Sequence, residues 1–339
     1  RVSAVVLRRI YAGPAHGERA VDAAAEMFPA WAATAPRARS EILRRTYDLM
    51  ISNSEGLAAL MTWENGKALP DAEAEVTYAA EFFRWFAEEA VRTDGQYGQA
   101  PNGASRTIVT QHPIGVAALV TPWNFPAAMA TRKIAPALAA GCTVVLKPAA
   151  ETPLTALAIA HLMRDAGLPD GVVNIVPTTR PGQVVDSWLA DARVRKLSFT
   201  GSTNVGKALL SRSADRVLST SMELGGNAPF VVARDADIRV AVREAMVAKF
   251  RNGGQACTAA NRFFVHSDVY EQFATAFEDA VVGLRLGHGL HPRTQIGPLV
   301  STRAVAGVQE WVERAVHSGG HVSVRASLPD LPGAFFAPT

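Results

Sequence analysis

Residues 116–147 read VAALVTPWNFPAAMATRKIAPALAAGCTVVLK. The runs Val116–Val120 and Thr143–Leu146 are short and apolar, as strands buried on both faces of a sheet are. The segment between them, about Pro126–Ala140, is long enough for a helix. Because a helix is the usual connection between two parallel neighbouring strands, this stretch predicts a β-α-β unit.

The alternation of short apolar strands and helices continues beyond this unit. Further strands are predicted at Val172–Val176, Lys196–Phe199 and Thr220–Glu223, and further helices at about Thr155–Ala166 and Val205–Arg212. This order predicts an α/β fold with a Rossmann-like, doubly wound parallel sheet. Residues 18–90 are predicted to be helical, and a second α/β segment is predicted to begin after Asn227-Ala228-Pro229.

The composition excludes several classes of protein. A chain of 339 residues is longer than one hydrophobic core usually grows, which predicts two domains. With 48% hydrophobic and 19% charged residues the chain is too apolar to be disordered, and a net charge of +3 without a basic block gives no reason to expect nucleic acid as a partner. No apolar run reaches the roughly 18 residues of a membrane span. Residues 1–9 lack the pattern of a signal peptide, and two cysteines cannot form a disulfide framework, so we expect a cytoplasmic protein.

A glycine-rich turn follows one predicted strand and opens a helix. The segment from Gly201 to Lys207 reads GSTNVGK, which nearly spells the P-loop of a nucleotide hydrolase. A P-loop needs Ser or Thr after the lysine to hold Mg²⁺, and Ala208 has no side-chain oxygen, so this reading is disfavoured. A glycine-rich helix N-terminus still suits a pyrophosphate. The alternative is a tight turn without a ligand.

Two polar side chains lie where predicted strands end, which is where ligands bind in open α/β sheets. Asn124 lies between Pro122 and Pro126, and this rigid loop suits an amide presented to a ligand. Glu223 precedes two glycines, an unusual place for a solvated charge and a suitable one for acid–base chemistry. A structural turn and a surface carboxylate are the respective alternatives.

The two cysteines differ in their sequence surroundings. Cys257 follows a Gly-Gly turn at the end of a predicted helix, so it can project from a loop and act as a nucleophile. Cys142 lies in an apolar run and is predicted to be inert core. A thiol nucleophile, an amide donor, a carboxylate base and a phosphate-binding turn together suit covalent acyl chemistry coupled to a dinucleotide.

Five segments follow the order and approximate spacing of one known family: Thr121–Pro126, Lys147–Ala149, Phe199–Gly206, Glu223–Pro229 and Gln255–Cys257. From about residue 18 to its end, the chain resembles the aldehyde dehydrogenase superfamily. The stretches Asn124–Lys133 and Lys249–Cys257 most resemble those of succinate-semialdehyde dehydrogenases.

The resemblance implies roles for three catalytic residues. Cys257 attacks the aldehyde carbon, and the oxyanion that results is held by the Asn124 amide and the Cys257 backbone N–H. Glu223 activates the water that hydrolyses the thioester. Relatives that transfer the acyl group to coenzyme A commonly lack this carboxylate, so Glu223 implies release of a free acid. The resemblance gives no reason to expect a metal site.

The resemblance also implies a bound NADP or NAD. It assigns to the cofactor site Thr121, Pro122, Trp123, Lys147, Ala150, Gly201, Ser202, Gly206 and Leu224. Lys147 holds the adenosine ribose, and the two glycines with Ser202 face the pyrophosphate. Relatives that prefer NAD often have Glu at the position of Ala150. A small neutral side chain there removes repulsion against a 2′-phosphate, so we predict that NADP is accepted.

Two arginines match the family's substrate-carboxylate arginines. Guanidinium groups at Arg132 and Arg251 suit bidentate recognition of a carboxylate at the far end of the substrate. The alternatives are a surface arginine for Arg132 and a helix C-terminal charge for Arg251. Their joint presence predicts a semialdehyde acid, with succinate semialdehyde as the main candidate. Ala259 stands where some relatives carry a second cysteine, so a redox switch is not expected.

The resemblance further implies a division of the chain. We expect an NAD(P)-binding domain over residues 1–97 and 116–229, an oligomerisation or bridging strand segment over 98–115, and a catalytic domain over 230–339 that lacks its C-terminal part. Relative to the family, both ends look truncated, and the homodimer or homotetramer of the family is expected to be compromised. The alternatives to a succinate-semialdehyde dehydrogenase are an inactive fragment, a partner-binding remnant, or a dehydrogenase for another semialdehyde or aliphatic aldehyde.

Overall fold

The computed structural model describes residues 12–328 and 330–339, so the N-terminal stretch judged for a signal peptide lies outside the described residues. The chain divides into two compact units. Unit 1 consists of Arg1–Leu57 and Glu75–Glu223, and unit 2 consists of Ala58–Ala74 and Leu224–Thr339. Among the described residues, no helix combines the length and the apolar character that crossing a membrane requires.

Unit 1 contains a five-stranded sheet in the order β5-β4-β3-β6-β7. Its strands are β3 (Val116–Val120), β4 (Thr143–Lys147), β5 (Val173–Ile175), β6 (Val194–Gly201) and β7 (Ser219–Leu224). Strand β3 pairs in parallel with both β4 and β6, and β4 pairs in parallel with β5. Every residue of β3 and β4 is buried, as the apolar runs predict. The predicted doubly wound α/β sheet is therefore confirmed.

The strand order reverses at β3, which fixes where this sheet binds ligands. The chain runs outward from β3 through β4 to β5, and then returns to the other side of β3 as β6. The connecting helices before and after this return cover opposite faces of the sheet. A crevice is left at the carboxyl ends of β3 and β6, the switch point at which such sheets bind their ligands.

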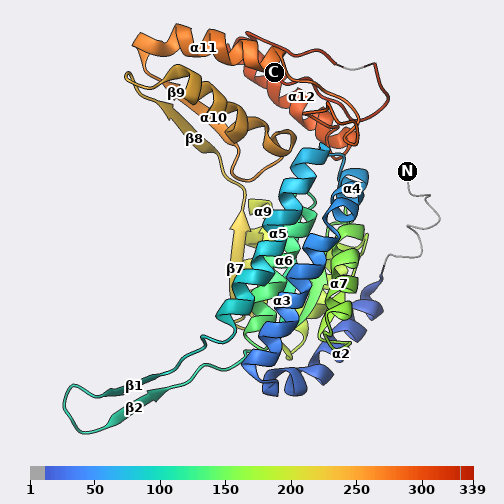
Figure 1. Ribbon diagram of the computed structural model, residues 1–339, viewed down its shortest axis with the longest axis vertical. Helices are drawn as coiled ribbons and strands as arrows, with labels where there is room; N and C mark the ends of the chain where they lie inside the picture. Colours follow the sequence, from blue (N-terminus) through green and yellow to red (C-terminus); the bar gives the residue numbers. More distant parts are fainter. Residues whose placement is uncertain (1–11, 329) are drawn as a thin grey trace. The chain divides into compact units, whose positions relative to one another are not determined.

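Helices cover the sheet of unit 1. They are α2 (Pro14–Ala33), α3 (Pro36–Ser52), most of α5 (Leu69–Glu89), α6 (Pro126–Ala139), α7 (Leu154–Asp165), α8 (Pro181–Ala190) and α9 (Thr203–Ala214). Helices α3, α6 and α7 pack against one another (Figure 1). Helix α8, which the sequence reasoning missed, packs on α2, where the buried Trp188 donates its indole N–H to the Gly17 carbonyl at 3.0 Å.

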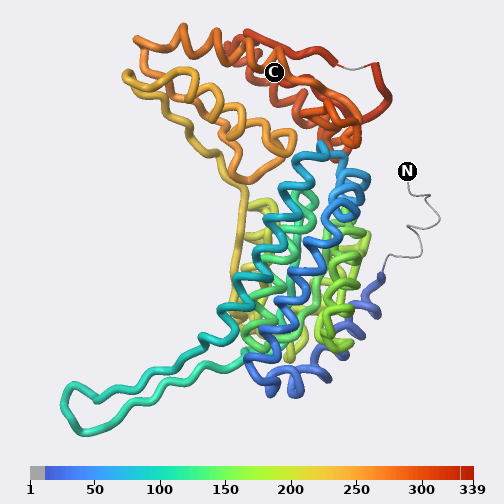
Figure 2. The backbone as a smooth tube through the Cα atoms, viewed as in Figure 1, coloured from blue at the N-terminus to red at the C-terminus, as the bar shows by residue number. Residues whose placement is uncertain are grey.

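An antiparallel hairpin projects from unit 1 (Figures 1 and 2). Strand β1 (Gln96–Gln99) pairs with β2 (Arg106–Val109), and every residue of both strands is exposed. Strand β1 straddles the predicted start of the bridging segment at residue 98, and β2 lies within that segment.

Unit 2 contains a smaller α/β segment, as predicted. Strands β8 (Ala228–Val232) and β9 (Ala260–Val265) are parallel, and α10 (Ile238–Phe250) connects them. Helix α11 (Ser267–Val282) packs on α10, and Val232, Ala245 and Phe273 form the buried centre of this segment. The unit also contains α12 (Thr302–His317), the 3-10 helix η1 (Arg251–Gly254) and most of α4 (Ser54–Asn65).

The two compact units differ from the predicted domain ranges at residues 58–74, which we had expected to belong with the cofactor domain. This segment belongs to unit 2 because its backbone packs closely against the stretch 287–298. Leu69 donates its backbone N–H to the Gly289 carbonyl at 2.9 Å, and a side chain on Gly297 would clash with the Gly66 carbonyl. The second difference is that unit 1 ends at Glu223, before the predicted boundary at 229.

Several aromatic residues lie near the end of α5. Phe83 is fully buried and Phe82 is partly buried, but Trp85 is 61% exposed. Because Trp85 lies two residues from Phe83 on a helix, it points away from the face that Phe83 buries.

Candidate functional site

A cavity of about 790 Å³ opens at the switch point of unit 1. Seven of the nine residues predicted to bind a cofactor line it: Thr121, Pro122, Trp123, Lys147, Ala150, Gly201 and Ser202. Parallel strands end at a common edge, which is why side chains that follow β3, β4 and β6 meet here. The other two residues lie elsewhere: Gly206 is buried within α9, and Leu224 ends β7 and belongs to unit 2.

The N-terminus of α9 opens into this cavity. The Ser202 hydroxyl caps the helix by accepting the Val205 N–H at 3.5 Å, and a side chain on Gly201 would clash with the Phe199 ring. A helix N-terminus carries partial positive charge and free N–H groups, which suit a pyrophosphate. Within the part of the chain that the structure describes, the buried hydroxyl of Thr200, which also lines the cavity, has no hydrogen-bond partner. These features fit a dinucleotide.

Lys147 brings a buried cation to the same cavity. It is the last residue of β4 and is 8% exposed. Burial lowers the pKa of its ammonium group, and the nearby charge of Glu151 partly opposes this shift. A lysine held in this way can donate hydrogen bonds to the hydroxyls of a bound ribose. Ala208 also lines the cavity and has no hydroxyl for Mg²⁺, as the sequence argument against a P-loop requires.

The loop with Asn124 is held at both ends. Before it, Thr121 donates its N–H to the Lys147 carbonyl at 3.1 Å. After it, Glu75 accepts the backbone N–H groups of Ala127 and Ala128, at 2.9 and 3.1 Å, in the first turn of α6. Glu75 is 2% exposed, and the helix N-terminus favours its negative charge. Sequence reasoning missed Glu75, although a carboxylate among the buried residues of α5 is an unusual feature.

Glu223 and Arg132 line a second cavity of unit 1, of about 460 Å³. Lys133 lies there too and donates from its ammonium group to the Ser198 hydroxyl at 2.9 Å. The pKa of Lys133 is lowered to about 8, mainly by burial and also by the charges of Arg132 and Lys196, while the charge of Glu223 opposes this shift. The exposed carboxylate of Glu223 therefore stands among several cations. Sequence reasoning missed Lys133.

The Arg132 side chain is only half-buried and lies against an aromatic ring. Its guanidinium carbon is 5.7 Å from the centre of the Phe82 ring. This cavity also contains Cys142, which is 4% exposed, so the prediction that this thiol belongs to the core is confirmed.

Cys257 lies in unit 2, in the loop between η1 and β9, and is exposed. Three consecutive residues of the preceding turn, Asn252, Gly253 and Gly254, have positive φ angles of 59°, 62° and 76°. Glycine adopts this left-handed conformation without strain, and asparagine is one of the few other residues that tolerates it. The Gly-Gly turn predicted before the cysteine is therefore a real reversal of the backbone.

The predicted catalytic and substrate residues are divided between the units. Asn124, Glu223 and Arg132 belong to unit 1, whereas Cys257 and Arg251 belong to unit 2. Neither unit alone holds the whole predicted set. Within unit 1, Glu223 and Arg132 share one cavity and the cofactor residues share the other.

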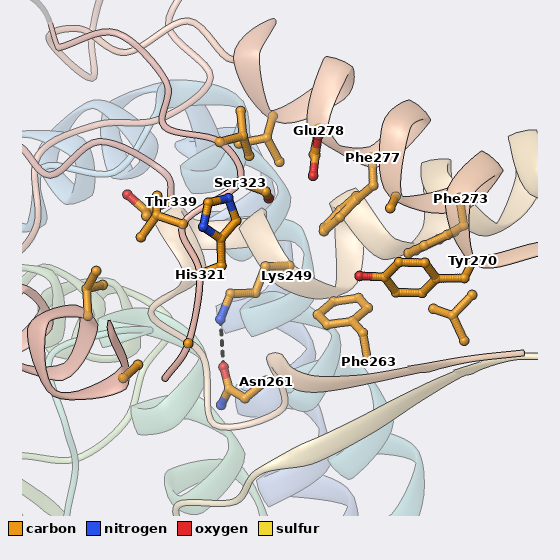
Figure 3. Close-up of a pocket in the computed structure, with 18 of the residues that line it drawn as sticks. Lys249, Asn261, Phe263, Tyr270, Phe273, Phe277, Glu278, His321, Ser323 and Thr339 are labelled. Atoms are coloured by element: carbon orange, nitrogen blue, oxygen red, sulfur yellow. Dashed lines mark hydrogen bonds between the residues drawn. The ribbon is translucent and has the colours of Figure 1, made fainter. Parts of the chain in front are cut away.

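Unit 2 has a cavity of its own, of about 530 Å³ (Figure 3). Aromatic side chains of β9 and α11 form much of its wall, among them Phe263, Tyr270 and Phe273. The Lys249 ammonium group donates to the Asn261 side-chain oxygen at 2.6 Å, and burial lowers its pKa. None of the residues predicted from the sequence to bind cofactor or substrate lines this cavity.

Comparisons with known proteins agree with these features. A model of the aldehyde dehydrogenase family matches residues 3–339. The succinate-semialdehyde dehydrogenase of Paenarthrobacter nicotinovorans is 52% identical over 321 residues, which cover 94% of this chain and 71% of that protein. The glutarate-semialdehyde dehydrogenase of Pseudomonas putida is 49% identical over 327 residues, which cover 96% of this chain and 68% of that protein. The crystal structure of an NADP-dependent enzyme from E. coli superposes with a TM-score of 0.94 at 46% identity. The match covers 97% of this chain and 68% of that one.

Proposed function

Because this chain belongs to the aldehyde dehydrogenase family, we propose that it oxidises a semialdehyde acid to the free diacid with NADP⁺ or NAD⁺. Succinate semialdehyde is the first candidate substrate, and the relatives named for succinate and glutarate semialdehyde support this class. The observation that carries the proposal is the switch-point cavity of unit 1, which gathers the predicted cofactor residues around a helix N-terminus.

We assign the covalent chemistry to Cys257. Its thiolate adds to the aldehyde carbon, and the carbonyl oxygen takes up the negative charge. The Asn124 side-chain amide and the Cys257 backbone N–H donate to this oxyanion; one such donor is typically worth about 3–4 kcal/mol. A nicotinamide cofactor held by the residues of the switch-point cavity would supply the hydride acceptor, and loss of hydride from the substrate carbon would leave a thioester on Cys257. The exposure of the thiol supports this role.

Glu223 takes the proton from the water that hydrolyses the thioester. The hydroxide equivalent adds to the acyl carbon, the carboxylic acid leaves, and the Cys257 thiolate is released for another turnover. Lys133 and Lys196 line the same cavity as Glu223 and place positive charge beside its carboxylate. Lys133 is buried at an electrostatic cost, which supports a functional reason for its position.

The choice between the two cofactors is proposed to depend on Ala150. Ala150 lines the switch-point cavity near Lys147, together with Arg212, whose guanidinium pairs with Asp186. A small neutral residue leaves space for a 2′-phosphate, and the Lys147 ammonium group in the same lining carries the opposite charge. We therefore propose that NADP⁺ is accepted at least as well as NAD⁺.

Replacing Ala150 by glutamate is expected to shift this choice toward NAD⁺. The new carboxylate repels a 2′-phosphate and can accept a hydrogen bond from a free 2′-hydroxyl, so the ratio of kcat/KM for NADP⁺ to that for NAD⁺ should fall about tenfold or more. Steady-state kinetics with each cofactor measure the ratio. Ala150→Gln, which has the same size without the charge, is the matched control. A wild-type preference for NAD⁺ above tenfold would contradict the proposal.

The substrate class is tested by removing an arginine. In Arg251→Ala, kcat/KM for succinate semialdehyde should fall about 10- to 100-fold, because hydrogen bonds to a charged group are worth roughly 1.5–3 kcal/mol. Oxidation of butanal, which has no carboxylate, should change little, and Arg132→Ala should show the same selectivity. Formation of reduced cofactor is the readout. Equal losses with both aldehydes would refute the role of Arg251, and a wild-type chain that oxidises neither aldehyde would refute the proposed function.

The remaining assignments follow from the family. We propose that the projecting hairpin β1–β2 serves in assembly with further copies of the chain, because both of its strands are exposed and its outer edges present backbone groups for pairing. The two free cysteines support a reducing compartment, and we propose the cytoplasm.

A further inference from the structure

A partly buried carboxylate of α5, that of Asp71, contacts the loop that leads to Cys257. The Asp71 Oδ2 atom accepts the backbone N–H of Asn252 at 3.1 Å, a bond between residues 181 positions apart in the sequence. Both residues belong to unit 2. Asn252 is 1% exposed, so its N–H cannot turn to water if this acceptor is removed.

The turn that Asp71 contacts also contains hydrogen bonds between its own residues. Asn252 donates from its side-chain amide to the Gln255 carbonyl at 3.2 Å, and Gln255 donates its N–H back to the Asn252 carbonyl at 3.2 Å. These bonds fix the shape of the turn without fixing where it lies. Its bonds to other elements include the one to Asp71 and one in which the Gln255 side chain accepts the Val300 N–H at 3.2 Å.

The charge of Asp71 is suited to this task. Burial raises the pKa of its carboxyl group, while the Asn252 N–H and the charges of Lys67 and Arg251 oppose that rise. Asp71 also lies in the first turn of α5, where the helix N-terminus favours a negative charge. An ionised acceptor makes a stronger hydrogen bond to a backbone N–H than a neutral one does. Asp71 thus provides a fixed attachment for the turn. Removing its carboxylate from water lowers the stability of the protein.

We propose that Asp71 is a positioning residue for the loop that carries Cys257. Asn252 precedes the cysteine by five residues, and the short backbone between them transmits a shift of the turn to the thiol. A displacement of about 1 Å in a reacting group costs on the order of 10²-fold in rate. This proposal rests on the assignment of Cys257 as the nucleophile, and Asp71 itself touches neither substrate nor cofactor.

The test compares Asp71→Ala with Asp71→Asn, whose amide oxygen can still accept the Asn252 N–H. Hydrogen exchange, read by mass spectrometry on the peptide over residues 250–257, reports the bond without any need for activity. We expect exchange about tenfold or more faster in Asp71→Ala and near the wild-type rate in Asp71→Asn. Asp235→Asn, at an exposed carboxylate of the same unit, is the matched control and should change nothing.

Kinetics then separate positioning from a merely structural role. In Asp71→Ala, kcat should fall about 10- to 100-fold with the KM for the cofactor unchanged within twofold, and Asp71→Asn should restore kcat to within about threefold of wild type. Faster exchange with an unchanged kcat would overturn the proposal, as would an Asp71→Asn variant as impaired as Asp71→Ala. If Asp71→Ala does not fold, the proposal is tested with Asp71→Asn alone. A kcat of Asp71→Asn more than tenfold below wild type, together with an unchanged rate of hydrogen exchange, would contradict the proposal. A wild-type chain without aldehyde oxidation would refute the proposed function, while the exchange experiment would still test the hold on the loop.

Discussion

Replacing Cys257 by alanine is expected to lower aldehyde oxidation by about 10³-fold or more, while the affinity for the cofactor stays within twofold of wild type. The activity is lost because no other group can form the thioester. The cofactor affinity is kept because the switch-point cavity lies in unit 1 and Cys257 in unit 2. Formation of reduced cofactor measures the first quantity, and equilibrium binding of NADP⁺ measures the second.

Alkylation provides the control for this variant. Cys257 is exposed and Cys142 is 4% exposed, so brief treatment with iodoacetamide should modify Cys257 and leave Cys142 intact. Mass spectrometry of the digested protein identifies the modified thiol, and the loss of activity should follow the modification of Cys257 in proportion. Activity that survives complete modification of Cys257, or a Cys257→Ala variant within tenfold of wild type, would show that this thiol is not the nucleophile.

Replacing Glu75 by alanine is expected to lower the free energy of unfolding by about 2–5 kcal/mol. Two backbone N–H groups in the first turn of α6, at Ala127 and Ala128, lose their acceptor, and both are buried. Each buried donor without a partner costs roughly 1–3 kcal/mol. Urea-induced unfolding measures the change as a lower midpoint with an unchanged slope.

Two variants serve as controls. One keeps the length of the Glu75 side chain, and the other removes a different glutamate from the same helix. Glu75→Gln keeps an acceptor and loses the charge that the α6 N-terminus favours, so its loss should be about 1 kcal/mol. Glu88→Ala, at an exposed position of the same helix α5, should stay within about 0.5 kcal/mol of wild type. Because α6 directly follows the loop with Asn124, we also expect Glu75→Ala to lower kcat. A Glu75→Ala variant as stable as Glu88→Ala would mean that the hydrogen bonds from Ala127 and Ala128 to Glu75 contribute nothing to the free energy of unfolding.

Most of the residues that the family resemblance assigns to the cofactor line one cavity. Lys147 and Gly201 each lie at the end of an apolar strand, and Thr121 directly follows one, so a pattern confined to a few residues was enough to bring them to one edge of the sheet. Gly206, which the resemblance also assigns to the cofactor, lies in α9 and is not among the residues that line this cavity.

The supporting residues could not be predicted in this way. Asp71 and Glu75 lie in one helix, and neither belongs to a recognisable motif. Their partners are 181 and 52 residues away, and a hydrogen bond between distant elements leaves no periodic signal in either of them. Lys133 was missed for a related reason, since a lysine in an amphipathic helix usually faces water and only the packing of α6 on the sheet buries it.

The sequence by itself determined the alternation of strands and helices, the exclusion of a Mg²⁺-holding P-loop by Ala208, and the family. These are local properties, because backbone preferences and apolar periodicity act over a few neighbouring residues. The tertiary structure alone decided that residues 58–74 pack with unit 2, that Glu223 stands among cations, and that the turn before Cys257 is anchored to a carboxylate of α5. Each of these depends on which distant groups are excluded from water together, and burial of that kind is settled only when the whole chain has packed.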